Sequence, residues 1–141
     1  MNDLLLFLGI WLIIYVVYQY FNVIETYEDP MTIAIQAKLV QVDPRAALLS
    51  ISASDQSFTE DKQRTYLCLK DKNGKYYDDN MLMYVALHEL AHAISKQTDP
   101  NHTTSEFREN FQQLLDKAAV LKLYDPQIPI DYSYCPAPPR K

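Results

Sequence analysis

The sequence predicts an α+β protein, with an N-terminal transmembrane helix followed by a small domain of helices and short strands. Residues 4–24 carry no charge, and later segments show either helical spacing of apolar residues or short runs of strand-forming residues. A chain of 141 residues has room for one such domain. We therefore divide the sequence into an anchor and its flank at 1–29, a domain at 30–123 and a tail at 124–141.

The uncharged N-terminal segment is predicted to cross a membrane once. A helix over residues 4–24 would be about 31 Å long, which matches the apolar thickness of a bilayer. Tyr15, Tyr18 and Tyr20 gather toward its C-terminal end, as in the aromatic belt at a membrane surface. A cleaved signal peptide is the alternative, although the segment lacks a basic start and no small-residue cleavage site follows it. The predicted localisation is therefore a membrane, with a single pass.

The side of the membrane on which the domain lies is weakly encoded. The first basic residue is Lys38, so the positive-inside rule has almost nothing to count. Cys68 and Cys135 are the only cysteines, which is too few for a disulfide scaffold, although a single bridge is compatible with them. We expect a free or packed thiol at Cys135 and place the domain on a reducing side.

The first half of the domain is predicted to contain one helix and two strands. Pro30 can open the helix, and its apolar stripe consists of Ile33, Ala34, Ala37, Leu39 and Val40. Residues 48–53 alternate between apolar and small polar side chains, and residues 65–69 are rich in strand formers, so both are predicted strands. The polar residues 54–64 are expected to form a loop, and Asn73-Gly74 a hairpin turn.

Two helices are predicted in the second half of the domain. Asp79 or Asn80 caps the first helix, which runs to about Gln97. A capping box, Thr103-Thr104-Ser105-Glu106, opens the second helix, which ends near Lys122. The second helix is expected to pack on the first through Phe107, Phe111, Leu114, Leu115 and Ala118. The tail is rich in proline and should be extended.

The first of these two helices carries the HExxH motif His88-Glu89-Leu90-Ala91-His92. Positions i and i+4 lie on one face of a helix, so His88 and His92 can bind a single zinc ion. Glu89 lies at the flank of that face, where its carboxylate can act as general base toward a water molecule that the metal activates. The alternative is a core helix with polar residues, but it would bury two histidines and a glutamate without a metal to satisfy them.

A zinc site of this kind needs a third protein ligand, and His102 is the first candidate. It follows a segment containing Asp99 and Pro100 that ends the motif helix, so it should lie on the turn between the two helices. Glu106, on the first turn of the second helix, is the rival ligand. His102 is preferred because imidazole is a common zinc ligand and a capping glutamate already has a structural role.

Around the motif the chain reads LMYVALHELAHAI and then DPNHTTSEFRENFQQLL. This pattern resembles the WLM and SprT-like zinc metallopeptidases, in which HELAH is followed by a short loop, an Asn-His or Pro-His, and a helix containing phenylalanine. A longer stretch, YLCLKDKNGKYYDDNMLMYVALHELAH, looks like small membrane-anchored versions encoded by large DNA viruses. The resemblance covers residues 65–121 and implies a minimal zincin-like domain with zinc on His88, His92 and His102 and a catalytic Glu89.

Together, motif and resemblance lead us to expect a membrane-anchored zinc metallopeptidase that hydrolyses peptide bonds of a protein or peptide substrate. The predicted strand at 65–69, if it lies at the sheet edge, could hold an extended peptide by strand addition. Tyr132 or Tyr134 could stabilise the oxyanion, and the sequence does not choose between them. No DNA-binding or ubiquitin-binding extension is seen, so the repair functions of larger SprT-like proteins are not expected.

The alternative function is a structural or assembly protein of a virion or similar particle, in which the zinc site is structural or a relic. Its partners would be virion or capsid proteins. For either function, the reducing side on which we place the domain is the cytosol or the virion interior, and the membrane could be that of a virion. Glu89 argues for the enzyme, because a structural site needs the histidines but not the acid. A net charge of −5 without a basic stripe argues against nucleic acid as a partner.

Overall fold

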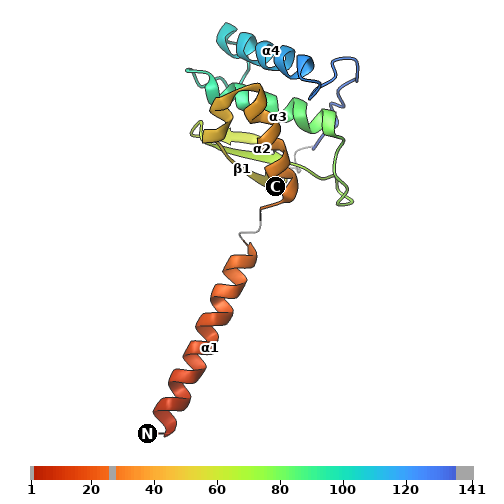
Figure 1. The fold of residues 1–141 in the computed structure, drawn as a ribbon. Coiled ribbons are helices and arrows are strands. Elements are labelled where there is room, and N and C mark those ends of the chain that lie inside the picture. The colour runs from red at the N-terminus through yellow and green to blue at the C-terminus, as the bar shows by residue number, and fades with distance from the viewer. Residues whose placement is uncertain (1, 26–27, 136–141) are drawn as a thin grey trace.

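The computed structural model describes residues 2–25 and 28–135 (Figure 1). The domain is α+β, as predicted. In chain order its elements are the helices α1 (Asn2–Glu25) and α2 (Pro30–Val42), the 3-10 helix η1 (Pro44–Leu48), the strands β1 (Ser50–Ser54), β2 (Phe58–Glu60) and β3 (Arg64–Cys68), and the helices α3 (Asp79–Ile94) and α4 (Ser105–Val120).

The N-terminal segment forms the predicted helix, α1, and its large apolar side chains between Leu5 and Tyr20 are exposed. Within the described part of the chain, however, no helix combines the length and the apolar character that a membrane crossing requires. The predicted transmembrane anchor at residues 4–24 is therefore wrong, and so is the predicted single-pass membrane localisation. Within α1 the Gln19 amide donates a hydrogen bond to the Tyr15 hydroxyl at 3.0 Å.

The sheet has three strands in the order β1-β3-β2. β1 pairs with β3 in parallel, and β2 pairs with β3 in antiparallel orientation, with Phe58 opposite Tyr66. The prediction of a loop over residues 54–64 is wrong for β2, because a strand of three residues is too short to show an alternating pattern. The predicted strand at 65–69 corresponds to β3, but it lies in the centre of the sheet rather than at its edge.

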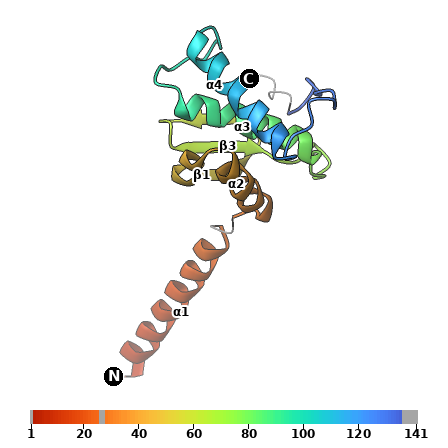
Figure 2. The same ribbon diagram turned by 45° about the horizontal axis from the view of Figure 1, so that its top comes forward.

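Helix α3 lies between α4 and the sheet, and α2 contacts both α3 and β1 (Figure 2). The core between these elements is aliphatic, with fully buried side chains that include Ile35, Leu39, Leu67, Leu82, Leu87, Leu90 and Leu114. The stripe predicted for α2 is wrong in part, because Ile33 is 56% exposed whereas Thr32, Ile35 and Val42 are buried. The buried face therefore includes Thr32, whose hydroxyl donates to the carbonyl of Asp29 at 2.6 Å.

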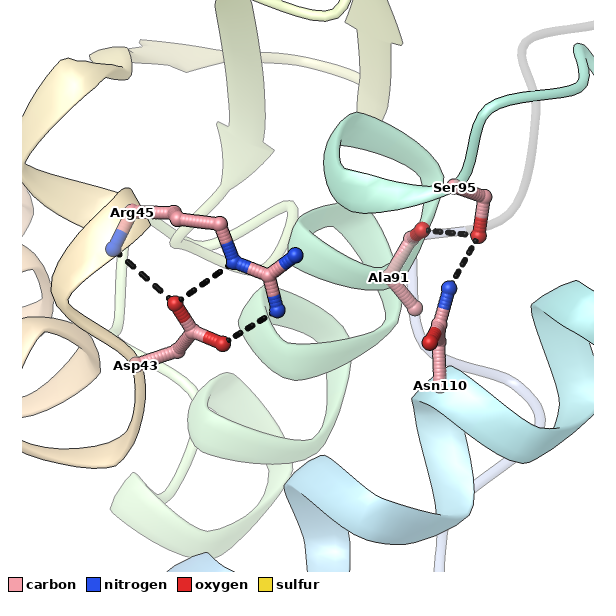
Figure 3. A network of polar contacts seen from close by, with 5 residues as sticks. All are labelled: Asp43, Arg45, Ala91, Ser95 and Asn110. Carbon is pink, nitrogen blue, oxygen red and sulfur yellow. Dashed lines mark hydrogen bonds and ion pairs between the residues drawn. The ribbon is translucent and has the colours of Figure 1, made fainter.

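Two polar networks hold the ends of the helices (Figure 3). Asp43 accepts hydrogen bonds from the backbone N–H, Nε and Nη2 of Arg45, and these bonds hold the pKa of its carboxyl below the usual range despite burial. Ser95 follows the last turn of α3, where its hydroxyl donates to the Ala91 carbonyl at 2.7 Å and accepts from the Asn110 amide at 3.0 Å. The second network ties the C-terminal end of α3 to α4.

The segment after α4 returns to the sheet, where Cys135 forms a disulfide with Cys68 across a sequence separation of 67. The predicted free or packed thiol is therefore wrong, since the spacing of two distant cysteines does not reveal whether they meet in space. The cysteines thus give no support to a reducing environment for the domain. Residues 136–141, the last part of the tail that was predicted to be extended, lie outside the described residues.

Candidate metal centre

The structure brings the three predicted histidines together. His88 and His92 lie on successive turns of α3, and His102 lies in the loop between α3 and α4. The Nε2 atom of His102 is 3.1 Å from that of His88 and 3.0 Å from that of His92. Two nitrogens bound to one tetrahedral zinc ion, each about 2.05 Å from it, would lie roughly 3.4 Å apart. The donor set and its spacing therefore fit a zinc ion.

The surroundings of His88 and His92 favour the neutral form of both imidazoles. Burial, together with the nearby His92 and His102, lowers the pKa of His88 to about 4. Burial also lowers the pKa of His92, and His102 acts in the same direction. A neutral imidazole has a free ring lone pair, which is the form that binds a metal. The lowered pKa values of the two helix histidines therefore favour the form that binds a metal ion.

The Phe107 ring, on the first turn of α4, packs against the rings of all three histidines. Its ring centroid lies 4.4 Å from that of His92, 5.0 Å from that of His102 and 5.2 Å from that of His88. Only 2% of Phe107 is exposed, so its ring position is fixed by the core. The sequence pattern correctly predicted that Phe107 faces α3, and the structure shows that this packing also orients the histidine rings.

His102 has a positive φ of 57°, a conformation that side chains rarely adopt outside turns. The loop is held by buried Asp99, whose carboxylate accepts hydrogen bonds from the backbone N–H and hydroxyl groups of both Thr103 and Thr104. Burial alone would raise the pKa of Asp99, but these four bonds outweigh it and hold the pKa well below the usual range. The sequence placed Asp99 at the end of the motif helix but did not reveal its bonds to the threonines, although an aspartate followed by two threonines at this spacing is typical of side-chain capping.

Glu106, the rival third ligand, binds backbone groups and does not join the histidine cluster. Its carboxylate accepts hydrogen bonds from the backbone N–H of Lys96 at 2.8 Å and of Gln97 at 3.3 Å. Among the described residues, the group able to hold a metal consists of His88, His92 and His102. Glu106 thus joins the segment after α3 to the start of α4, rather than reaching back to the cap of its own helix as a capping box would require.

Lys62 also binds the C-terminal end of α3. It lies in the turn between β2 and β3, and its ammonium group donates to the carbonyls of His92, Ser95 and Gln97. The last carbonyls of a helix have no partner within the helix, and they carry partial negative charge, so an ammonium group suits them. No sequence signal linked Lys62 to the motif, because the contact depends on the unpredicted strand β2.

Glu89 is buried, with 5% of its surface exposed, and faces the sheet. The Thr59 hydroxyl of β2 lies 2.8 Å from Glu89 Oε2 and donates a hydrogen bond to it. Burial raises the pKa of Glu89 to about 7, although the bond from Thr59 acts in the opposite direction. Glu89, Thr59 and the three histidines line one cavity of about 490 Å³, so the carboxylate and the candidate metal ligands face the same space.

Comparison with known proteins gives relatives in three viruses. The chain is 39% identical over 94 residues to uncharacterized protein 136R of Invertebrate iridescent virus 6, covering 64% of this chain and 51% of that protein. It is 42% identical over 88 residues to uncharacterized protein 042R of Invertebrate iridescent virus 3, covering 62% and 54%. It is 41% identical over 83 residues to uncharacterized protein R325 of Acanthamoeba polyphaga mimivirus, covering 57% and 39%.

The chain is related to proteins of large DNA viruses. This relationship agrees with the viral origin that the sequence resemblance implied. The chain spans about half the length, or less, of these curated relatives. No protein-family model matches it, and no solved structure matches it. Membership of the WLM or SprT-like peptidases therefore stays a prediction.

Proposed function

We propose that this chain is a zinc-dependent metallopeptidase. The observation that carries the proposal is the convergence of three imidazole nitrogens beside a buried carboxylate in one open cavity. His88, His92 and His102 would hold the ion and leave a fourth position for water or substrate, as in catalytic zinc sites. Zinc, when bound there, supplies a Lewis acid that lowers the pKa of a coordinated water and polarises a carbonyl.

Glu89 is the general base of the proposed reaction. Its position in the motif places it next to His88, and the hydrogen bond from Thr59 fixes one carboxylate oxygen. Glu89 takes a proton from the attacking water and passes it to the leaving amine as the peptide bond breaks. A site that only stabilised the fold would need the three histidines but would have no use for a buried carboxylate facing the cavity.

The free edge of β2 provides a place for an extended peptide substrate. β2 pairs with β3 on one side only, so its other edge is unpaired in the described sheet. Two residues of β2, Phe58 and Thr59, line the cavity. An unpaired strand edge can bind a peptide through backbone hydrogen bonds. The proposed peptide-binding edge therefore moves from residues 65–69, where the sequence suggested it, to β2, and the peptide would pass directly over Glu89.

Tyr132 is the better of the two candidates for stabilising the oxyanion. Tyr134 is engaged elsewhere, because its hydroxyl contacts Ser57 at 3.0 Å and donates to the carbonyl of Cys68. Burial also raises the pKa of Tyr134 to about 12. Tyr132 is 90% exposed and lines a cavity together with His88 and His102, so its hydroxyl is available to a substrate. A hydrogen-bond donor aimed at developing negative charge contributes strongly to such reactions.

The test of this function combines metal content with cleavage. The full chain, purified after expression with added zinc, should contain about one zinc ion per chain, because one ligand cluster exists among the described residues. It should cleave members of a broad peptide library, lose that activity with phenanthroline and recover it when zinc is restored. Absence of zinc, or zinc without cleavage of any peptide, would contradict the proposal and leave a structural role for the site.

A further inference from the structure

A second cavity, of about 620 Å³, adjoins the candidate metal centre. His88 and His102 line both this cavity and the one that holds Glu89, so the two spaces meet at the histidine cluster. From His88 the second cavity continues along α3 past Val85 and Met81. At 1.5 Å per residue these positions lie about 4.5 and 10.5 Å along the helix axis from His88. A residue of an extended peptide spans about 3.4 Å, so the cavity lies within reach of a residue flanking the scissile bond.

The walls of this cavity are suited to a large apolar side chain. One wall is Met81, Tyr84 and Val85 on α3, and the other includes Ile130 and Tyr132 from the segment after α4. Asp131 is the one carboxylate among the lining residues, and it accepts hydrogen bonds from the backbone and hydroxyl of Ser133. The aromatic and aliphatic side chains in its lining suit a phenylalanine or leucine side chain better than a charged one, and the cavity has ample room for either.

The wall formed by the segment after α4 is joined covalently to the sheet through the disulfide of Cys135. Cys135 is joined to Cys68 at the end of β3, and its backbone N–H donates to the Tyr77 hydroxyl at 3.1 Å. Next to it, the Tyr134 ring packs on Tyr77 with 4.7 Å between centroids. A wall fixed in this way presents a preformed cavity, which lowers the entropic cost of binding. The disulfide therefore serves the site by holding residues 130–135 opposite α3.

We propose that this cavity is the specificity pocket of the proposed peptidase, and that it takes a large apolar or aromatic side chain of the residue next to the scissile bond. The inference rests on the proposed function. It names the substrate class, which is a peptide with such a residue at the cleavage site. It also assigns residues 130–135, which lie beyond the HExxH motif and its loop, to substrate selection.

The test uses two small probes on the zinc-loaded full chain, phenylalanine hydroxamate and alanine hydroxamate, which share the metal-binding group and differ in the side chain. The wild type should bind the phenylalanine probe at least about tenfold more tightly, the scale by which apolar pockets discriminate side chains. Val85→Trp narrows the cavity from α3 beside His88 and should abolish this difference while alanine hydroxamate still binds. Ile130→Trp narrows it from the opposite wall and gives the same test should the first variant fail to fold.

Val120→Trp is the matched control, because Val120 is 83% exposed on α4 and does not line the cavity. It should keep the tenfold preference. Equal binding of the two probes by the wild type would overturn the assignment of this cavity as a specificity pocket. An unchanged preference in both Val85→Trp and Ile130→Trp would overturn it as well.

Cleavage of the peptide library then separates the two proposals. If peptides are cleaved without preference for a large apolar residue and the probes bind equally, the pocket fails and the peptidase stands. If no peptide is cleaved but the probe preference is lost in the two tryptophan variants, the peptidase fails and the selectivity of the cavity for a large apolar side chain stands.

Discussion

Thr59 and Glu89 join the edge strand to the motif helix, with the Thr59 hydroxyl donating a hydrogen bond to Glu89 Oε2 at 2.8 Å. The same hydroxyl lies 3.2 Å from the backbone carbonyl of Glu89 and 3.3 Å from the hydroxyl of Thr65. One side chain of β2 thus touches the proposed base, its helix and the neighbouring strand. The strand proposed to hold the substrate also fixes the orientation of the group proposed to activate the water.

Thr59→Val should reduce kcat roughly tenfold, the scale of one lost hydrogen bond to a charged group, because Glu89 loses its fixed orientation. Zinc content should not change, since Thr59 touches none of the three histidine nitrogens in the cluster. Steady-state kinetics on a cleaved library peptide measures the effect. Thr65→Val is the control, because it removes the contact between the two threonines but leaves Thr59 bonded to Glu89. Equal losses in the two variants would show that the strand pairing matters rather than the bond to Glu89.

Asp99→Asn should weaken zinc binding by roughly 10- to 100-fold, the usual cost of losing a group that orients a metal ligand. The amide cannot accept all four hydrogen bonds from Thr103 and Thr104, so the strained turn at His102 loses its support. Competition with a chelator of known affinity measures the change. Asp71→Asn is the matched control, since Asp71 accepts backbone hydrogen bonds from Asn73 and Lys75 in a turn that does not line the site. An Asp99→Asn variant that keeps wild-type affinity would show that His102 needs no such support.

His102→Ala should weaken zinc binding more than Glu106→Ala. The first variant removes one of three converging nitrogens, whereas the second removes a carboxylate that binds the backbone of Lys96 and Gln97. Glu106→Ala should instead lower the melting temperature, because it frees two N–H groups after α3. Metal competition and thermal unfolding together distinguish these effects, and the reverse order of zinc affinities would transfer the third ligand to Glu106.

Tyr132→Phe should lower kcat by at least about tenfold while zinc content stays the same, because the variant lacks the hydroxyl proposed to donate to the oxyanion. Tyr134→Phe should have little effect on kcat. It should destabilise the fold by about 0.5–1.5 kcal/mol, since the Tyr134 hydroxyl bonds Ser57 and the Cys68 carbonyl rather than substrate. Kinetics and denaturant unfolding of both variants test the assignment, which is reversed if Tyr134→Phe is the variant that loses kcat.

The sequence predicted the parts of the site that depend on local spacing. In the structure the HExxH pattern puts His88 and His92 on one face of α3, because residues four apart on a helix always share a face. His102 could be placed on the interhelical turn because Pro100 and the capping threonines mark where one helix ends and the next begins. The metal binding of these residues stays a prediction, but their convergence is observed.

The remaining parts depend on contacts between distant segments, and local patterns do not encode them. β2 exists because it pairs with β3, so the polar stretch around Thr59 looked like a loop and the contact with Glu89 went unseen. The bond between Cys68 and Cys135 likewise depends on the path of the chain after α4. The predicted membrane anchor was also wrong, since no helix in the described part of the chain meets the length and apolar character of a membrane span.

The most direct test of the central claim is the peptidase activity of Glu89→Gln, measured beside the wild type on the same cleaved peptide. Glutamine keeps the volume and the hydrogen bond from Thr59 but cannot accept a proton. If Glu89 is the general base, activity should fall by at least about 10²-fold, with zinc content and melting temperature near those of the wild type. A Glu89→Gln variant that binds zinc and cleaves the peptide as fast as the wild type would contradict the account.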